Sequence, residues 1–127
     1  DIEQIYRRAV FNYLAGVTDD HDRNFSFTMD EAGVWRLAPA YDLTFTVNYK
    51  NRFIGDRHAM SIEERDRKMS RDQLMRLAKE NDVQGAGGII EEVTESVMMF
   101  RKNAQGIVST EYVELISRFI QEQVGNL

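Results

Sequence analysis

The sequence has no cysteine, one proline and no apolar run long enough to cross a membrane, which takes about 18 residues. Without cysteine the chain has no disulfides, thiolate metal sites or thiol nucleophiles, in agreement with a reducing compartment. The missing apolar run excludes a membrane-spanning helix of the usual kind. We therefore expect a cytoplasmic protein that has no membrane partner.

Basic residues are outnumbered, since 16 Lys and Arg stand against 21 Asp and Glu and the formal net charge is −5. An acidic surface repels a phosphate backbone on average, so direct nucleic-acid binding is not expected. Apolar residues make up 43% of the 127, a globular composition for a single domain over residues 1–127. Because the chain begins at Asp1 inside an amphipathic pattern, we expect it to be a fragment of a longer protein.

Apolar residues near the N-terminus recur at the three- and four-residue spacing of a core-facing helix, which should end near Gly16. These apolar positions are Ile2, Ile5, Tyr6, Ala9, Val10, Tyr13, Leu14 and Val17. Further along, Ser70-Arg-Asp-Gln73 has the form of a capping box and predicts a short helix over about 70–81.

Two more helices are predicted in the C-terminal part, where Gly85-Ala-Gly-Gly88 is interpreted as a helix-start turn. One helix covers 88–103 and places Met98 and Met99 in the core. Its apolar face carries Ile89, Ile90, Val93, Val97 and Phe100. Ser109 or Thr110 can cap the next helix. The apolar positions of that helix are Tyr112, Val113, Ile116, Phe119, Ile120 and Val124. The C-terminal half is therefore expected to be a helical bundle.

Residues 25–37 have the pattern of a β-hairpin, with two alternating segments around the turn Asp30-Glu-Ala-Gly33. Trp35 is expected in the core of this hairpin, and Pro39 ends the pairing. Residues 44–69 show no clear period and are predicted to be irregular, with the charged run Glu63–Lys68 as a solvent-exposed face or loop. The predicted fold is mainly α with one short β-hairpin.

The loop between the first helix and the hairpin carries Asp19, Asp20, Asp22 and Asn24. Two like charges about 5 Å apart repel by roughly 3 kcal/mol at an effective dielectric near 20, and a divalent cation would compensate. Oxygen-only ligands favour Mg²⁺, Mn²⁺ or Ca²⁺ over zinc. Asp42 follows the hairpin, which can fold it back beside this loop.

Asp19 and Asn24 have the D-x-x-x-x-N spacing of protein-kinase catalytic loops. In those loops the Asp orients or deprotonates the acceptor hydroxyl and the Asn holds Mg²⁺. Asp42 would then be the second metal-binding acid. His21 and His58 are the only histidines, and without cysteine they make no convincing zinc site, so both are interpreted as hydrogen-bonding scaffold residues.

Two alternatives from other classes remain. The first is a non-catalytic helical interaction module in which the acidic loop has lost its function. The second is an EF-hand, whose ligand positions would be Asp20, Asp22, Asn24, Ser26, Thr28 and Glu31. Against the EF-hand, Phe25 stands where its loop needs Gly, and the residues after Glu31 favour a turn and strand over an exiting helix.

Three segments resemble the C-terminal lobe of the HipA-like serine/threonine kinases, the toxins of bacterial toxin–antitoxin systems. They are Gly16-Val-Thr-Asp-Asp-His-Asp-Arg-Asn-Phe-Ser-Phe27, Trp35-Arg-Leu-Ala-Pro-Ala-Tyr-Asp-Leu43 and His58-Ala-Met-Ser61. The resemblance covers most of residues 1–103. It implies a protein-kinase-like C-terminal lobe, a helical bundle that is active only together with an N-terminal lobe.

The resemblance also implies roles for single residues. Asp19 would be the catalytic base, and Asn24 and Asp42 the Mg²⁺ ligands. His21 belongs to the signature T-D-x-H-x-[KR]-N-F-S of this loop. Arg23 replaces the commoner Lys and keeps a positive charge where a phosphate can approach.

The implied cofactors are ATP and Mg²⁺, and the γ-phosphate of ATP would pass to a protein hydroxyl. The implied partners are a protein substrate and a HipB-like helix-turn-helix antitoxin. The family's N-terminal lobe supplies a phosphate-covering loop and a nucleotide-binding lysine, and neither has a candidate in this sequence. We therefore expect the isolated chain to have no kinase activity.

Overall fold

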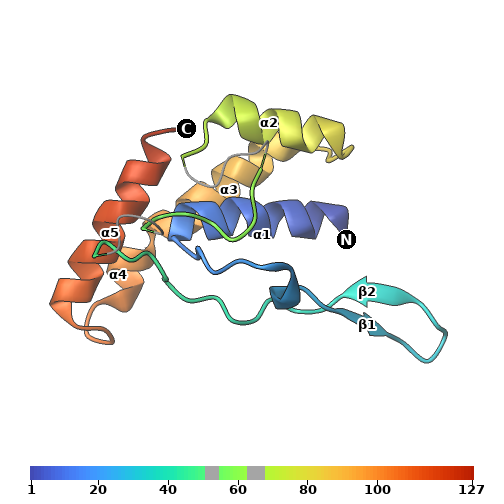
Figure 1. The fold of residues 1–127 in the computed structure, drawn as a ribbon, viewed down its shortest axis with the longest axis horizontal. Helices are drawn as coiled ribbons and strands as arrows, with labels where there is room; N and C mark the ends of the chain where they lie inside the picture. Colours follow the sequence, from blue (N-terminus) through green and yellow to red (C-terminus); the bar gives the residue numbers. More distant parts are fainter. Residues whose placement is uncertain (51–54, 63–67) are drawn as a thin grey trace.

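The computed structural model describes residues 1–50, 55–62 and 68–127. A two-stranded hairpin extends from a body of helices (Figure 1). In chain order the elements are α1 (Ile2–Ala15), the 3₁₀ turn η1 (Asp22–Asn24), β1 (Phe27–Met29), β2 (Trp35–Leu37), α2 (Arg71–Glu80), α3 (Ala86–Met98), α4 (Phe100–Ala104) and α5 (Thr110–Val124). The prediction of a mainly α chain with a short hairpin is confirmed. None of the helices in the described ranges combines the length and the apolar character needed to cross a bilayer.

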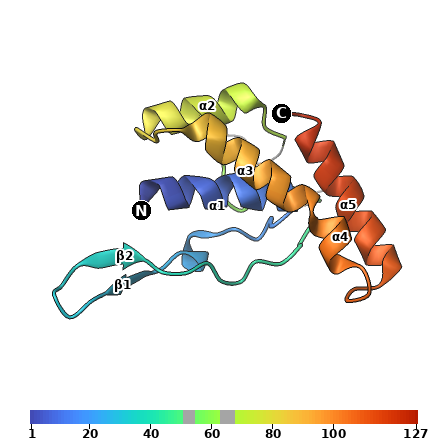
Figure 2. The same cartoon turned by 180° about the vertical axis from the view of Figure 1, so that it is seen from behind.

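The hydrophobic core forms where α1 packs against α3 and α5, while α2 packs on α3 (Figure 2). Val10 and Leu14 of α1 are fully buried. The buried apolar cluster comprises Tyr6, Val10, Tyr13, Leu14, Met69, Leu74, Ala78, Val83, Ala86, Ile89, Ile90, Val93, Val97 and Ile120. The predicted helical stripes are therefore confirmed in the main, although Ile2 and Tyr112 are exposed at the surface.

The first helix ends where predicted, because Gly16 adopts a left-handed conformation with φ of 70° and its N–H donates to the Asn12 carbonyl. This turn directs the chain away from the helix axis and into the polar loop. Glycine reaches positive φ without steric cost, which explains why the helix stops at this residue.

The predicted capping box of α2 is confirmed. The Gln73 backbone N–H donates to Ser70 Oγ at 3.4 Å, and the Ser70 backbone N–H donates to Gln73 Oε1 at 2.9 Å. Ser109 stands at the corresponding position before α5, but its side chain makes no capping hydrogen bond. The two serines therefore differ in what they contribute to their helices.

We expect Ser70→Ala to lower the free energy of unfolding by about 1 kcal/mol, because the Gln73 backbone N–H loses Ser70 Oγ as its acceptor. Ser109→Ala is the matched control and should cost less, since no capping bond is lost. Urea denaturation followed by circular dichroism measures both variants. Equal losses in the two variants would contradict this interpretation.

The helix predicted over 88–103 is interrupted at Met99, so that α3 and α4 are separate elements. Met98 and Met99 are 45% and 44% exposed, and their predicted core placement is wrong. The buried face of α3 includes Val93 and Val97, and each further residue turns about 100° around the helix axis, which moves Met98 away from the core.

The hairpin pairs β1 with β2 in antiparallel register, with Phe27 opposite Leu37 and Met29 opposite Trp35. Asp30 closes the turn, because its Oδ1 accepts the Ala32 backbone N–H at 2.9 Å. Trp35 is 61% exposed, so its predicted place in a hairpin core is wrong. Among the described residues, no second layer covers the faces of the two strands, which leaves the indole exposed.

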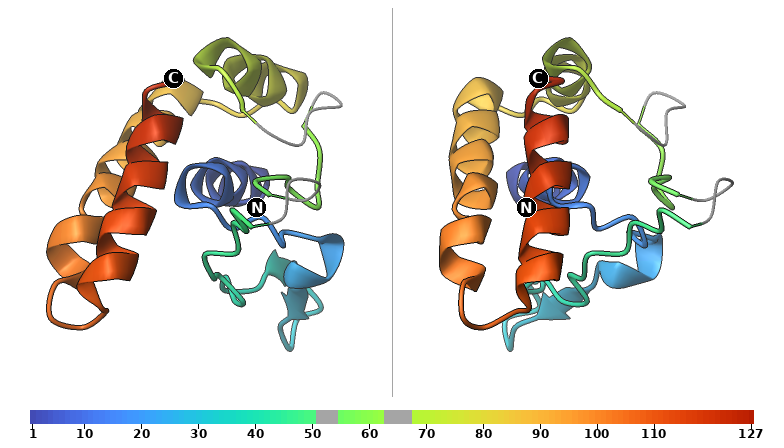
Figure 3. Two further views of the ribbon diagram at one scale, coloured as in Figure 1. Left: turned by 60° about the vertical axis from the view of Figure 1, so that its left-hand side comes forward. Right: turned by 90° about the vertical axis from the view of Figure 1, so that its left-hand side faces the viewer.

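In its described parts, the segment between the hairpin and α2 contains no helix or extended strand, which confirms the prediction of irregular structure. Residues 55–62 of this segment lie on the side of α1 opposite α3 (Figure 3). Residues 63–67 of the charged run lie outside the described residues, and Lys68 is exposed.

Candidate active site

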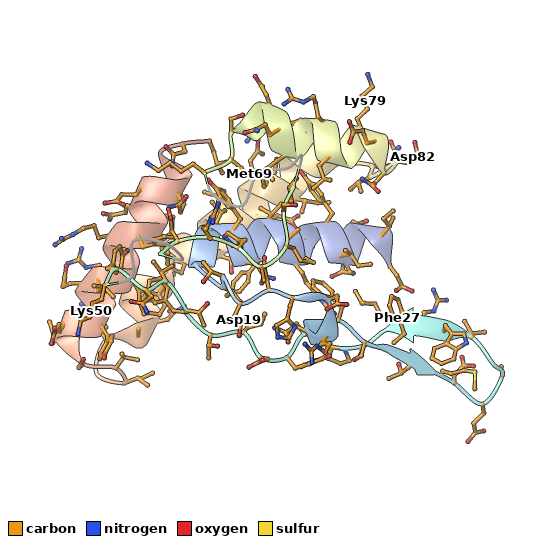
Figure 4. The ribbon with its side chains drawn as sticks, viewed as in Figure 1. Asp19, Phe27, Lys50, Met69, Lys79 and Asp82 are labelled. Atoms are coloured by element: carbon orange, nitrogen blue, oxygen red, sulfur yellow. The ribbon has the colours of Figure 1, made fainter. Side chains whose placement is uncertain are left out.

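The polar loop starts at the end of α1 and leads into β1. Figure 4 labels Asp19 in this loop and Phe27 at the beginning of β1. The second half of the loop contains the 3₁₀ turn η1, which is closed by a hydrogen bond from the Asn24 N–H to the His21 carbonyl at 3.0 Å. The loop is therefore held between a helix and a strand, with a short 3₁₀ turn inside it.

Asp19 and Asn24 are brought together by a hydrogen bond. The Asn24 side-chain Nδ2 donates to the Asp19 carbonyl oxygen at 2.7 Å. This bond engages the amide nitrogen, so the amide oxygen is the Asn24 atom suited to a cation. Asp19 itself is exposed, while its neighbours Thr18 and Asp20 are buried. The arrangement presents the Asp19 carboxylate to solvent on a backbone fixed from both sides.

The chain folds back after the hairpin, so that residues 41–46 run beside the loop in the opposite direction (Figure 1). The Tyr41 hydroxyl donates to the Arg23 carbonyl at 2.6 Å, and the Thr46 N–H donates to the Gly16 carbonyl at 3.0 Å. Asp42 therefore lies in a segment that is bonded to the loop at both ends. Its role as a metal ligand stays a prediction.

The backbone of Asp42 adopts φ of 55°, a left-handed conformation that is uncommon for a residue with a Cβ. Aspartate tolerates this conformation better than most residues, but it still carries strain. Such strain is concentrated at functional sites, where a side chain must point in a direction that regular backbone does not give. The conformation is thus consistent with a functional carboxylate.

Asp20 differs from the other acids of the loop. Its carboxylate is buried and its Oδ2 lies 2.8 Å from His58 Nδ1. One acid of the crowded loop therefore has a histidine as its hydrogen-bond partner. This pairing confirms His58 as a hydrogen-bonding scaffold residue and removes Asp20 from the candidate metal ligands.

His21 and Arg23 flank Asp22 in and beside η1. The His21 carbonyl closes the turn, whereas its buried Nδ1 has no hydrogen-bond partner among the described residues. Arg23 is exposed, and its carbonyl accepts the Tyr41 hydroxyl. Any contact of these side chains with phosphate stays a prediction.

Sequence reasoning missed Tyr41 and Thr46 as residues that hold the site. Thr46 Oγ1 accepts the backbone N–H groups of Thr18 at 2.8 Å and Asp19 at 3.1 Å. Tyr41 stands next to Asp42, which was a signal for its importance. Thr46 lies in a segment without periodicity, and no local pattern distinguished it.

The donor set suits Mg²⁺ bound together with a nucleotide. No group of three or more His, Asp or Glu side chains in the described ranges is placed to hold a metal. Mg²⁺ usually keeps several waters and binds one or two carboxylates plus substrate phosphates. The Asn24 amide oxygen and the Asp42 carboxylate are hard oxygen donors that fit this mode.

The EF-hand alternative does not fit the fold. Thr28 lies in β1 and pairs with Arg36 across the hairpin. The place of the exiting helix is taken by a turn and by β2. An EF-hand requires a helix on both sides of its loop, so the prediction against this alternative is confirmed.

Adjoining segments of this helical lobe carry an exposed Asp, a neighbouring Asn and a returning acid. A protein-kinase C-terminal lobe has this organisation. A family model described as the HipA-like C-terminal domain matches residues 1–100, and the chain belongs to this family. The match confirms the resemblance seen in the three sequence segments.

Two curated relatives come from Sinorhizobium fredii (strain NBRC 101917 / NGR234). One, "Putative kinase Y4mE", is 37% identical over 65 residues, which cover 51% of this chain and 15% of the relative. The other, "Putative kinase Y4dM", is 33% identical over 104 residues, which cover 80% of this chain and 24% of the relative. The chain thus spans under a quarter of the length of either relative.

Proposed function

We propose that this chain is the C-terminal catalytic lobe of an ATP- and Mg²⁺-dependent serine/threonine protein kinase of the HipA-like toxin type. The observation that carries the proposal is the bond between Asn24 Nδ2 and the Asp19 carbonyl, beside a segment that returns Asp42 to the same loop. Family membership and the names of the two relatives support it.

In the proposed reaction the exposed Asp19 carboxylate accepts the proton of the substrate hydroxyl as that oxygen attacks the γ-phosphorus of ATP. The bond from the γ-phosphorus to the β,γ-bridging oxygen breaks, and ADP leaves. Asn24 and Asp42 supply the oxygen ligands for Mg²⁺. A Mg²⁺ ion held by these two residues would supply positive charge against the charge that develops on the transferring phosphoryl group. Catalysis of this kind depends mostly on position, and the loop backbone is already fixed by the Asn24 and Thr46 bonds.

The proposed activity belongs to a longer chain. The loop that covers the phosphates and the lysine that binds them would come from an N-terminal lobe, so the isolated residues 1–127 are expected to be inactive. Phosphate transfer from ATP by the purified chain alone would contradict this.

The proposal also includes a cytoplasmic location, a protein substrate and a HipB-like helix-turn-helix antitoxin as partner. These belong to the proposal, because they concern the whole protein rather than this lobe. The acidic net charge of −5 favours protein contacts over direct contact of this lobe with DNA.

A non-catalytic interaction module is the second candidate, and one observation favours it. Phe27, Met29 and Trp35 share one face of the hairpin and are all exposed. Exposed apolar residues in a group mark contact surfaces. A module of this kind has no need for nucleotide-dependent metal binding, which separates it from the kinase.

The proposed metal site is tested by Asp42→Asn in the full-length protein. We expect Mn²⁺ affinity in the presence of a non-hydrolysable ATP analogue to fall at least about tenfold, because a charged ligand is lost. Electron paramagnetic resonance of free Mn²⁺ measures the affinity. Glu31→Gln, an exposed acid in the hairpin turn, is the matched control and should leave the affinity unchanged. Unchanged affinity in Asp42→Asn would refute the metal role.

A further inference from the structure

The strongest feature outside the proposed reacting groups is a buried pair of ionisable side chains, Asp20 and His58. Asp20 Oδ2 lies 2.8 Å from His58 Nδ1, and Asp20 Oδ1 accepts the Met60 backbone N–H at 3.1 Å. The side chains of His58 and Asp20 are only 8% and 7% exposed. Both carboxylate oxygens therefore have partners in one short segment, residues 58–60.

The same segment is bonded to the residue on the other side of Asp19. The Ala59 N–H donates to the Thr18 carbonyl at 2.9 Å. Thr18 and Asp20 are thus both tied to residues 58–60, and Asp19 lies between them with its carboxylate exposed. Residues 17–20 have no regular secondary structure, so hydrogen bonds orient Asp19. The bonds to residues 58–60 hold the neighbours on both sides of Asp19, in addition to the bonds that Asn24 and Thr46 make to its backbone.

His58 is itself held against the helical body. Its ring lies 5.9 Å from the ring of Tyr13 on α1, measured between centroids. The Tyr13 hydroxyl donates to the Met69 carbonyl at 3.2 Å and also accepts the Met69 N–H. Burial raises the pKa of the Tyr13 hydroxyl above its usual value, which itself lies well above neutral pH, so the protonated hydroxyl is available to donate to Met69. The pair therefore connects the loop to the core.

We propose that the Asp20–His58 pair positions Asp19 for catalysis, which rests on the function proposed above. Asp20 and His58 act through the backbone of Asp19 and touch no substrate. A buried ionisable pair contributes little net stability, because desolvation offsets the attraction between its members. Removing one member alone leaves the other buried without its partner, which lowers the stability of the fold as well as disturbing the geometry of Asp19. Each single variant is therefore assayed at a temperature at which it is fully folded.

The first test measures kinetics of the full-length protein carrying His58→Phe, which keeps a ring but loses the hydrogen bond. We expect kcat to fall about ten- to a hundredfold and the KM for ATP to change less than about twofold. His58→Asn restores a donor near the position of Nδ1 and should recover most of kcat. Asp20→Asn keeps the acceptor for Met60 and should give a smaller loss than His58→Phe.

The matched control is Tyr6→Phe, which removes another buried hydrogen bond, from the Tyr6 hydroxyl to the Leu74 carbonyl at 3.0 Å. It should lower the unfolding temperature while leaving kcat unchanged. A normal kcat in His58→Phe, or an equal fall of kcat in Tyr6→Phe, would overturn the positioning role.

A second measurement does not depend on activity. Hydrogen exchange followed by mass spectrometry should show amides of residues 18–20 and 58–60 exchanging about fivefold faster in His58→Phe, while peptides of α1 stay unchanged. Unchanged exchange at the loop would also overturn the proposal. If the wild-type protein transfers no phosphate but the loop is loosened as expected, the kinase function fails and the positioning of the Asp19 backbone survives.

Discussion

Replacing Asp19 with asparagine in the full-length protein is expected to lower kcat for phosphate transfer by about a hundred- to ten-thousandfold. An amide of the same shape cannot accept the proton of the substrate hydroxyl. The bonds that fix this residue, from Asn24 Nδ2 and to Thr46 Oγ1, involve the Asp19 backbone, so they survive the substitution. Because the carboxylate is exposed, the stability of the fold should hardly change.

Single-turnover transfer of the γ-phosphate from labelled ATP measures this effect. Asp22→Asn is the matched control, since Asp22 is an exposed acid in the same loop and the change in charge is identical. Its rate should stay within about twofold of wild type, as for most surface substitutions. If Asp19→Asn keeps the original rate, the assignment of the base is wrong. If both variants lose activity equally, the charge of the loop matters rather than the position of one carboxylate.

The largest loss of stability is expected for Gly16→Ala, at about 2–4 kcal/mol of unfolding free energy. Gly16 has φ of 70°, and a Cβ there would lie 2.7 Å from Phe45 Cε2 and 2.9 Å from Phe119 Cε1. These two rings meet edge to face with centroids 5.5 Å apart, so they cannot move apart without losing that contact. The substitution therefore adds a steric clash to an unfavourable backbone conformation.

Gly33→Ala in the hairpin turn is the control for Gly16→Ala. Gly33 also has positive φ, of 81°, but no atom lies within 4 Å of its added Cβ. It should cost only the backbone term, about 1–2 kcal/mol. Urea denaturation of both variants isolates the clash as the difference between them. Equal losses would show that Phe45 and Phe119 yield to the added methyl group.

The Gly16→Ala substitution is also expected to disturb the candidate site. The Gly16 carbonyl accepts the Thr46 N–H, and Thr46 Oγ1 accepts the Asp19 N–H. Movement of Gly16 would therefore be passed to the segment that holds the loop. Gly16→Ala is expected to reduce activity as well as stability, whereas Gly33→Ala should not.

Much of the fold could be predicted from short stretches of sequence. The end of the first helix at Gly16, the capping box of Ser70 and Gln73, and the turn at Asp30 depend on residues a few positions apart. Their physical causes, left-handed backbone and side-chain to backbone hydrogen bonds, act within one turn of chain. These predictions are confirmed because no distant contact competes with them.

Predictions of which apolar side chains are buried were less successful, because burial depends on other elements packing against them. Trp35 is exposed because nothing in the described residues covers that face of the hairpin, and Met98 lies off the buried side of α3. An apolar side chain favours burial, but whether it is buried depends on residues elsewhere in the chain that pack against it. The same holds for Tyr112, which lies in the first turn of α5 and is exposed at the surface.

For the candidate site, the sequence alone predicted Asp19, Asn24 and Asp42, because each belongs to a short motif. The partners that orient them were not predicted. His58 reaches Asp20, and Thr46 reaches Thr18 and Asp19, across 27 to 38 positions of chain. Hydrogen bonds over such separations form only after α1 and the irregular segment pack together. These partners are therefore determined by the tertiary structure and not by any local sequence pattern.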